Sequence, residues 1–143
     1  MRKYVHKVLV RKIISYIEKG YEKVDRSLVL TLLNETTPNL DCLDCFNHTG
    51  EDFDEGKEYL VWLRLCCFKV EKQDGKEKKA VYIKSTPTAV NRYDLFGQVI
   101  DRKNGELILD CGFYVFITGY ENIKVGDWIK ANGRLDVLGK RPT

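Results

Sequence analysis

The chain has 143 residues, of which 43% are hydrophobic, and a formal net charge of +3. This length and composition suit one globular domain that can bury a core without disulfides. Five cysteines at irregular spacings, with no signal-peptide core, lead us to expect a reducing cytoplasmic setting rather than a disulfide framework. Basic residues interrupt the apolar stretch near the start, so we expect no membrane insertion.

The charges are segregated along the chain. Residues 1–26 carry eight Lys and Arg against three acids, and residues 35–58 carry eight acids against Lys57. Residues 64–84 return to seven basic residues against three acids. A nucleic-acid binder presents a basic face, which the first and third blocks could supply. The alternative is that blocks of opposite sign pair with each other or face water.

The opening segment predicts a pair of antiparallel helices over residues 1–38. Apolar side chains recur at helical spacing over residues 4–19, and Gly20 ends this first helix. Asp25 can cap the second helix. β-branched residues are frequent in both segments, so a strand over residues 8–14 is the alternative.

After the helical pair the pattern changes to an acidic connector loop and then to strands. Residues 39–58 lack any periodicity and form the connector. Turn residues such as Asn104 and Gly105, which supply positive φ angles, separate the strands that follow. The expected strands cover residues 59–70, 80–85, 96–101, 106–110, 113–118 and 128–138.

Residues 95–138 carry the clearest structural pattern. A three-stranded meander is followed by Gly126-Asp127-Trp128-Ile129 and then by Gly133-Arg134-Leu135. This pattern resembles the oligonucleotide/oligosaccharide-binding (OB) fold, a small Greek-key β-barrel. The resemblance implies a surface that binds single-stranded nucleic acid.

The predicted fold class is therefore α+β. The expected organisation is an N-terminal helical pair over residues 1–38, an acidic connector over residues 39–58, and an OB-like barrel over residues 59–143. The barrel is expected to be a six-strand antiparallel Greek key, closed by the hairpin of residues 59–85.

A two-residue period along the barrel strands sorts their side chains by face. Trp128 would then point outward together with Arg134, so that an aromatic ring stacks on bases while cations contact phosphates. The alternative is that aromatic side chains such as Tyr114 and Phe116 pack under the flanking helices. The predicted nucleic-acid-binding residues are Trp128, Lys130, Arg134, Tyr114, Tyr82 and Lys84.

Cys42 and Cys45, with His48 nearby, resemble half of a zinc site. Two thiolates at this spacing can bind one tetrahedral ion, and His48 could be the third ligand. Either Cys66 or Cys67 would have to complete the set, because adjacent strand residues face opposite sides. The alternative is ordinary buried or loop cysteines. Zinc is the only cofactor that the sequence suggests.

No catalytic motif accompanies these features. The chain has two histidines and no Gly-x-Ser-x-Gly or phosphate-binding glycine motif, so we expect a binding protein and not an enzyme. The first hypothesis is single-stranded nucleic acid binding. The alternative is a protein-interaction module, for example an immunity or anti-defence type of protein, that uses the acidic loop and the N-terminal helices.

Overall fold

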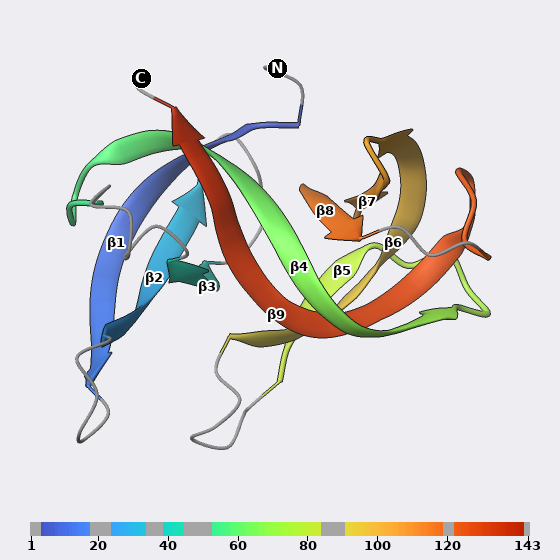
Figure 1. Cartoon of the computed structure of the whole chain (residues 1–143), viewed down its shortest axis with the longest axis horizontal. Helices are drawn as coiled ribbons and strands as arrows, with labels where there is room; N and C mark the ends of the chain where they lie inside the picture. Colours follow the sequence, from blue (N-terminus) through green and yellow to red (C-terminus); the bar gives the residue numbers. More distant parts are fainter. Residues whose placement is uncertain are drawn as a thin grey trace.

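The computed structural model of this chain describes residues 4–17, 24–33, 39–44, 53–83, 91–118 and 122–141 (Figure 1). Nine strands in these ranges belong to one sheet. They are β1 (His6–Ile17), β2 (Val24–Leu32), β3 (Leu40–Asp44), β4 (Glu58–Lys72), β5 (Lys79–Tyr82), β6 (Arg92–Lys103), β7 (Glu106–Asp110), β8 (Tyr114–Thr118) and β9 (Trp128–Arg141). No helix occurs in the described ranges, and therefore none that could span a membrane.

The predicted N-terminal helical pair is wrong, and with it the α+β class. The two segments form β1 and β2, which pair antiparallel. Leu9 on the outward side is also apolar, and a bulge between Val10 and Lys12 returns Ile13 to the inward side, opposite Leu28. These two features together produced the helical spacing seen in the sequence. The β-branched residues instead favour strands whose inward face repeats every second position. The buried residues of this face are Val8, Val10, Leu28, Leu30 and Leu32.

Five strands close into a first barrel. The pairing runs from β1 to β2, β3, β9 and β4, and β4 pairs again with β1. All neighbours are antiparallel except β3 and β9, which run parallel. The connector predicted over residues 39–58 thus contains β3, and residues 45–52 lie outside the described ranges.

A second closed circuit runs from β6 to β7, β8, β4 and β9, and β9 pairs again with β6. Its one parallel pair is β4 with β8, and β5 adds to the outer edge of β6. The long strands β4 and β9 cross the middle of the molecule and belong to both barrels (Figure 1). A small closed barrel consistent with the OB-like resemblance is therefore confirmed. The predicted arrangement of six antiparallel strands is wrong.

The two barrels are related by an internal two-fold symmetry of strand register. Leu65 of β4 pairs with Leu135 of β9, 70 positions later, and this pair marks the axis. On one side of it Arg64 pairs with Asp136, and on the other Cys66 pairs with Arg134. The β4–β9 ladder has two bulges, at Trp62/Leu63 and at Cys67/Lys69, and the two-fold symmetry relates one to the other. Strands β1 to β4 thus correspond to β6 to β9.

The turns that lead into β4 and β9 repeat the same backbone bonds. In the first unit the Val10 N–H donates to the Lys57 carbonyl at 3.0 Å, and Gly56 N–H donates to the Val10 carbonyl at 2.8 Å. In the second unit the Val99 N–H donates to the Asp127 carbonyl at 2.9 Å, and Gly126 N–H donates to the Val99 carbonyl at 2.7 Å. Both glycines have a positive φ, which this turn requires.

One hydrophobic core extends through both barrels. Its members include Leu28 of the first barrel, Leu109 of the second, and Leu65 and Leu135 of the shared strands. Because the shared strands contribute to both halves, the apolar surface that each barrel buries depends on the other barrel being present.

Candidate nucleic-acid interface

Strand β9 presents its side chains as the sequence pattern predicts. Ile129, Ala131 and Leu135 are fully buried, whereas the alternate positions Trp128 and Lys130 are partly exposed. The antiparallel ladder with β6 places Gln98 opposite Trp128 and Phe96 opposite Lys130. The outward side of β9 is therefore continuous with the outward side of β6.

Three lysines surround two aromatic rings on this surface. Lys79 Nζ lies 4.7 Å and Lys130 Nζ 5.6 Å from the centre of the Phe96 ring. Lys78 Nζ lies 5.8 Å from the centre of the Trp128 ring. Ammonium groups at this distance from a ring face are attracted by its quadrupole. We call these five residues the basic-aromatic face.

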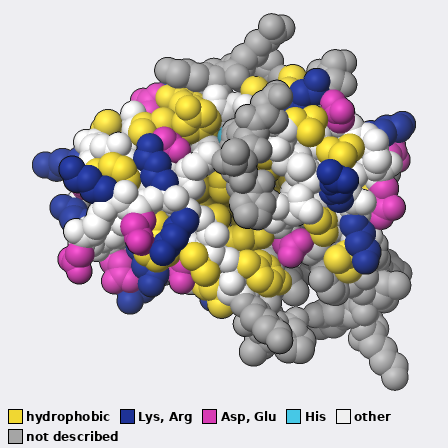
Figure 2. All heavy atoms as spheres, turned by 180° about the vertical axis from the view of Figure 1, so that it is seen from behind, with side chains coloured by type: hydrophobic (Ala, Val, Ile, Leu, Met, Phe, Trp, Pro, Cys, Tyr) yellow, Lys and Arg dark blue, Asp and Glu magenta, His cyan; other side chains and the backbone are white. Residues whose placement is uncertain are grey.

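Each lysine of the basic-aromatic face also has a carboxylate nearby. Lys78 contacts Asp110 at 2.7 Å and Lys79 contacts Glu77 at 3.1 Å, while Lys130 lies 3.9 Å from Asp94. Partly exposed ion pairs of this kind contribute only about 0 to 1 kcal/mol, so a phosphate can compete for the ammonium groups. Figure 2, which views the molecule from behind Figure 1, shows cationic, anionic and hydrophobic side chains intermingled on that side.

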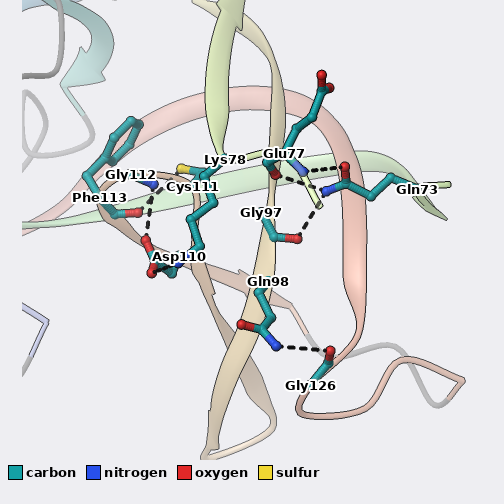
Figure 3. Close-up of polar contacts among 10 residues, drawn as sticks. All are labelled: Gln73, Glu77, Lys78, Gly97, Gln98, Asp110, Cys111, Gly112, Phe113 and Gly126. Atoms are coloured by element: carbon teal, nitrogen blue, oxygen red, sulfur yellow. Dashed lines mark hydrogen bonds and ion pairs between the residues drawn. The ribbon is translucent and has the colours of Figure 1, made fainter. Parts of the chain in front are cut away.

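The side chain of Gln73 forms hydrogen bonds that position the segment carrying Lys78 and Lys79. Its side-chain amide donates to the carbonyls of Glu77 at 3.1 Å and Ile129 at 3.1 Å, and its Oε1 accepts from Glu77 N–H at 3.0 Å. Figure 3 shows the contacts of Gln73 with Glu77 and with Gly97 of β6, and Lys78 extending toward Asp110. A longer contact of 3.4 Å joins the same amide to the Gly97 carbonyl, so these hydrogen bonds hold the segment before β5 against the middle of β6 and the start of β9.

The other predicted site residues are distributed over different surfaces. Arg134 lies on the outward side of β9, but its guanidinium donates to Asp136, from Nε to Oδ1 at 2.7 Å and from Nη2 to Oδ2 at 3.1 Å. Tyr82 pairs in register with the inward-facing Tyr93 and makes an edge contact with its ring. Tyr114 lies on β8, away from β9, and Lys84 lies outside the described residues.

The structure adds three residues that were not among the predicted ones: Phe96, Lys78 and Lys79. Their proximity to Trp128 depends on the β6–β9 register and on β5 pairing with β6, which are non-local. The only local signal was the alternation of Asp94, Phe96 and Gln98 with buried residues along β6.

Tyr114 and Phe116 belong to a second aromatic cluster on β8. Phe116 points outward yet is only 7% exposed, because Tyr4 packs over it. The alternative that these aromatic residues pack under flanking helices is wrong, because no helix occurs in the described ranges. Tyr4, which precedes β1, covers Phe116 instead. Tyr114 remains 37% exposed.

The hydroxyl of Tyr4 donates to Asp101 Oδ2 at 2.6 Å, and this bond together with burial raises the pKa of Tyr4 from 10.0 to about 12. We expect Asp101→Asn to lower the pKa of Tyr4 toward 10, measured by ultraviolet titration with Tyr4→Phe identifying the signal. Because folding raises this pKa, the free energy of unfolding falls as pH rises from about 10 toward 12. Tyr4→Phe should reduce that fall, and an unaltered titration in Asp101→Asn would contradict the assignment.

The predicted zinc ligands are only partly described. Cys42 is fully buried in β3 and belongs to the core cluster, whereas Cys66 is exposed on β4. Cys45 and His48 lie outside the described residues. No group of three or more metal-binding side chains occurs within the described ranges, so the zinc site stays a prediction.

Comparison of the chain with protein-family models, with curated proteins and with solved structures finds no significant match. The OB-like resemblance therefore rests on strand order and pairing. Because one fold serves many functions, the function must be argued from the side chains of the site.

Proposed function

We propose that this protein binds single-stranded nucleic acid, without catalysis, on the basic-aromatic face of β5, β6 and β9. The observation that carries the proposal is the placement of three ammonium groups within 6 Å of the Phe96 and Trp128 rings on one outward surface. Proteins that hold single strands combine aromatic rings for the bases with cations for the backbone.

The geometry supports a division of roles on this face. Trp128 stacks on one base and Phe96, on the neighbouring strand, stacks on another. Lys78, Lys79 and Lys130 contact the phosphates, exchanging their weak contacts with carboxylates for stronger ones with the backbone of the ligand. Such recognition depends little on base identity, because every base has a π face.

The expected result for Trp128→Ala is a loss of affinity for labelled single-stranded DNA and RNA of about 5-fold to about 150-fold, because a stacked base contributes about 1 to 3 kcal/mol. The measurement is a fluorescence-anisotropy titration at low and moderate salt. Affinity of the unmodified protein should fall steeply with salt as lysines replace counterions. Trp128 is partly exposed, so the variant should still unfold cooperatively.

Two control variants sharpen this experiment. Trp128→Phe retains a ring and should retain most of the affinity. Val125→Ala alters a 56% exposed residue in the turn before β9 and should have no effect. Absence of binding by the unmodified protein at low salt would falsify the proposal.

A protein partner is the second candidate, and one observation favours it. The lysines of the basic-aromatic face lie close to carboxylates, so the surface has little excess charge. Val81, 43% exposed, adds apolar area next to it, because it pairs with Asp94 on β6. A salt-tolerant complex with one protein, lost in Val81→Asp, would support this candidate.

A further inference from the structure

The outward surface of β7 and β8 is apolar and covered by the chain itself. Ile108 of β7 and Phe116 of β8 form a small cluster with Tyr4, and the cluster is separate from the main core. Trp62 and Ile100 pack at its margin. Without Tyr4 this surface would expose a patch of aromatic and aliphatic side chains.

Tyr4 lies on this surface as a planar ligand would. Its ring makes edge contacts with Tyr114, at a centroid distance of 5.2 Å, and with Phe116, at 6.3 Å. The hydroxyl donates to Asp101, and Lys103 Nζ lies 5.6 Å from the ring centre. The ring of Tyr4 therefore lies close to the ammonium group of Lys103, and its hydroxyl to the carboxylate of Asp101, on this surface.

The backbone of Tyr4 is in an unfavourable conformation. Its φ is 66°, in the left-handed region that bulky L-residues rarely occupy. The contacts of the ring and the hydroxyl must compensate for this strain. The chain is also anchored two residues later, where His6 Nε2 lies 3.1 Å from the Tyr114 nitrogen and 2.9 Å from the Tyr114 carbonyl oxygen. Tyr4 can therefore leave the surface while β1 stays in place.

We propose that the outer surface of β7 and β8 is a second binding surface for a nucleobase, and that Tyr4 is its resident occupant. The base would pack edge-on against Tyr114 and Phe116, as the Tyr4 ring does, and its N–H groups would donate to Asp101 in place of the Tyr4 hydroxyl. Lys103 would contact the adjacent phosphate. The choice of a nucleobase rests on the function proposed above, whereas the occupation of the surface by Tyr4 does not.

Tyr4 and the base exclude each other, so the apparent affinity of this surface equals its intrinsic affinity multiplied by the fraction of molecules in which Tyr4 has left. Any substitution that removes a contact between Tyr4 and this surface raises that fraction. Loss of a hydrogen bond to a carboxylate shifts such an equilibrium by roughly tenfold or more.

The test is an anisotropy titration of labelled, guanine-containing single-stranded DNA with the unmodified protein, Tyr4→Phe and Tyr4→Ala. Tyr4→Phe loses only the hydroxyl and should bind about tenfold more tightly or more. Tyr4→Ala should bind more tightly still, since no ring remains to compete. Tyr59→Phe is the matched control, because it also loses a tyrosine hydroxyl, one that accepts a hydrogen bond from Asp54 N–H at 2.9 Å and lies on neither binding surface; its affinity should not change.

The outcomes separate the two proposals. If the unmodified protein binds and neither Tyr4 variant binds more tightly, the second surface is refuted and the basic-aromatic face stands. If only the Tyr4 variants bind, and the gain survives in combination with Trp128→Ala, the second surface stands and the basic-aromatic face is refuted. Thermal unfolding is measured for each variant, and if Tyr4→Ala does not fold, Tyr4→Phe alone decides.

Discussion

Gly133→Ala is expected to destabilise the fold by about 3 kcal/mol or more, and with it to lower the yield of folded protein. A Cβ at this position would overlap the backbone carbonyl of Cys66 on the neighbouring strand. Gly133 pairs with Cys67, beside the bulge in β4. A backbone carbonyl cannot move aside as a side chain can. Urea unfolding followed by circular dichroism measures the effect.

Gly97→Ala should be comparably harmful, because its Cβ would overlap the carbonyl of Asp110. Gly75→Ala is the matched control. The atom nearest to a Cβ at Gly75 is the Gln73 side-chain oxygen at 4.0 Å, so the change should cost little. Equal stability of the Gly133 and Gly75 variants would show that the strands do not approach as described.

Leu135→Ala is expected to cost about 2 to 5 kcal/mol and to weaken both barrels together. Leu135 is fully buried and pairs with Leu65 on the internal two-fold axis. A cavity there lies in the part of the core that both circuits share. Hydrogen exchange should show reduced protection in β2 of the first barrel and in β7 of the second, with a single unfolding transition.

Val125→Ala serves again as the exposed control and should leave protection unchanged. Two separate unfolding transitions, or a loss of protection confined to one barrel, would mean that the barrels are energetically independent. That result would contradict the single core described above.

The sequence was sufficient where a local signal fixes the structure. Asn104 and Gly105 adopt φ angles of 49° and 79°, and the hairpin of β6 and β7 forms around them as predicted. The alternation in β9 correctly separated the buried Ile129 and Ala131 from Trp128. These features depend on neighbours in the chain, which a single sequence displays.

The N-terminal segment shows why the rest could not be predicted. Leu9 and Ile13 complete a helical stripe, yet Val8 and Val10 equally complete a strand face, and the pairing of β1 with both β2 and β4 decides between them. Local pattern cannot anticipate such partners, because tertiary context overrides propensity. The basic-aromatic face was incomplete for the same reason, since Phe96 reaches Lys130 only through strand register.

The internal repeat leaves few identities in the sequence. Phe53 corresponds to Ile123, whereas Gly56 recurs as Gly126 and Arg64 with Leu65 recurs as Arg134 with Leu135. The first residues of these sets, Phe53 and Ile123, are buried at 2% and 3% exposure. The spacing between equivalent positions changes from strand to strand, so the repeat has no fixed period in the sequence.

Because both barrels share β4 and β9, the order in which the strands are synthesised also determines when the chain can fold. β9 follows every other described strand, yet it closes both circuits. A ribosome that has made residues only as far as 127 has produced two open barrels, with edges of β3, β4 and β6 still unpaired. Exposed strand edges favour aggregation. A pause in translation before residue 128 should therefore leave a nascent chain dependent on chaperones, and release should follow when β9 emerges.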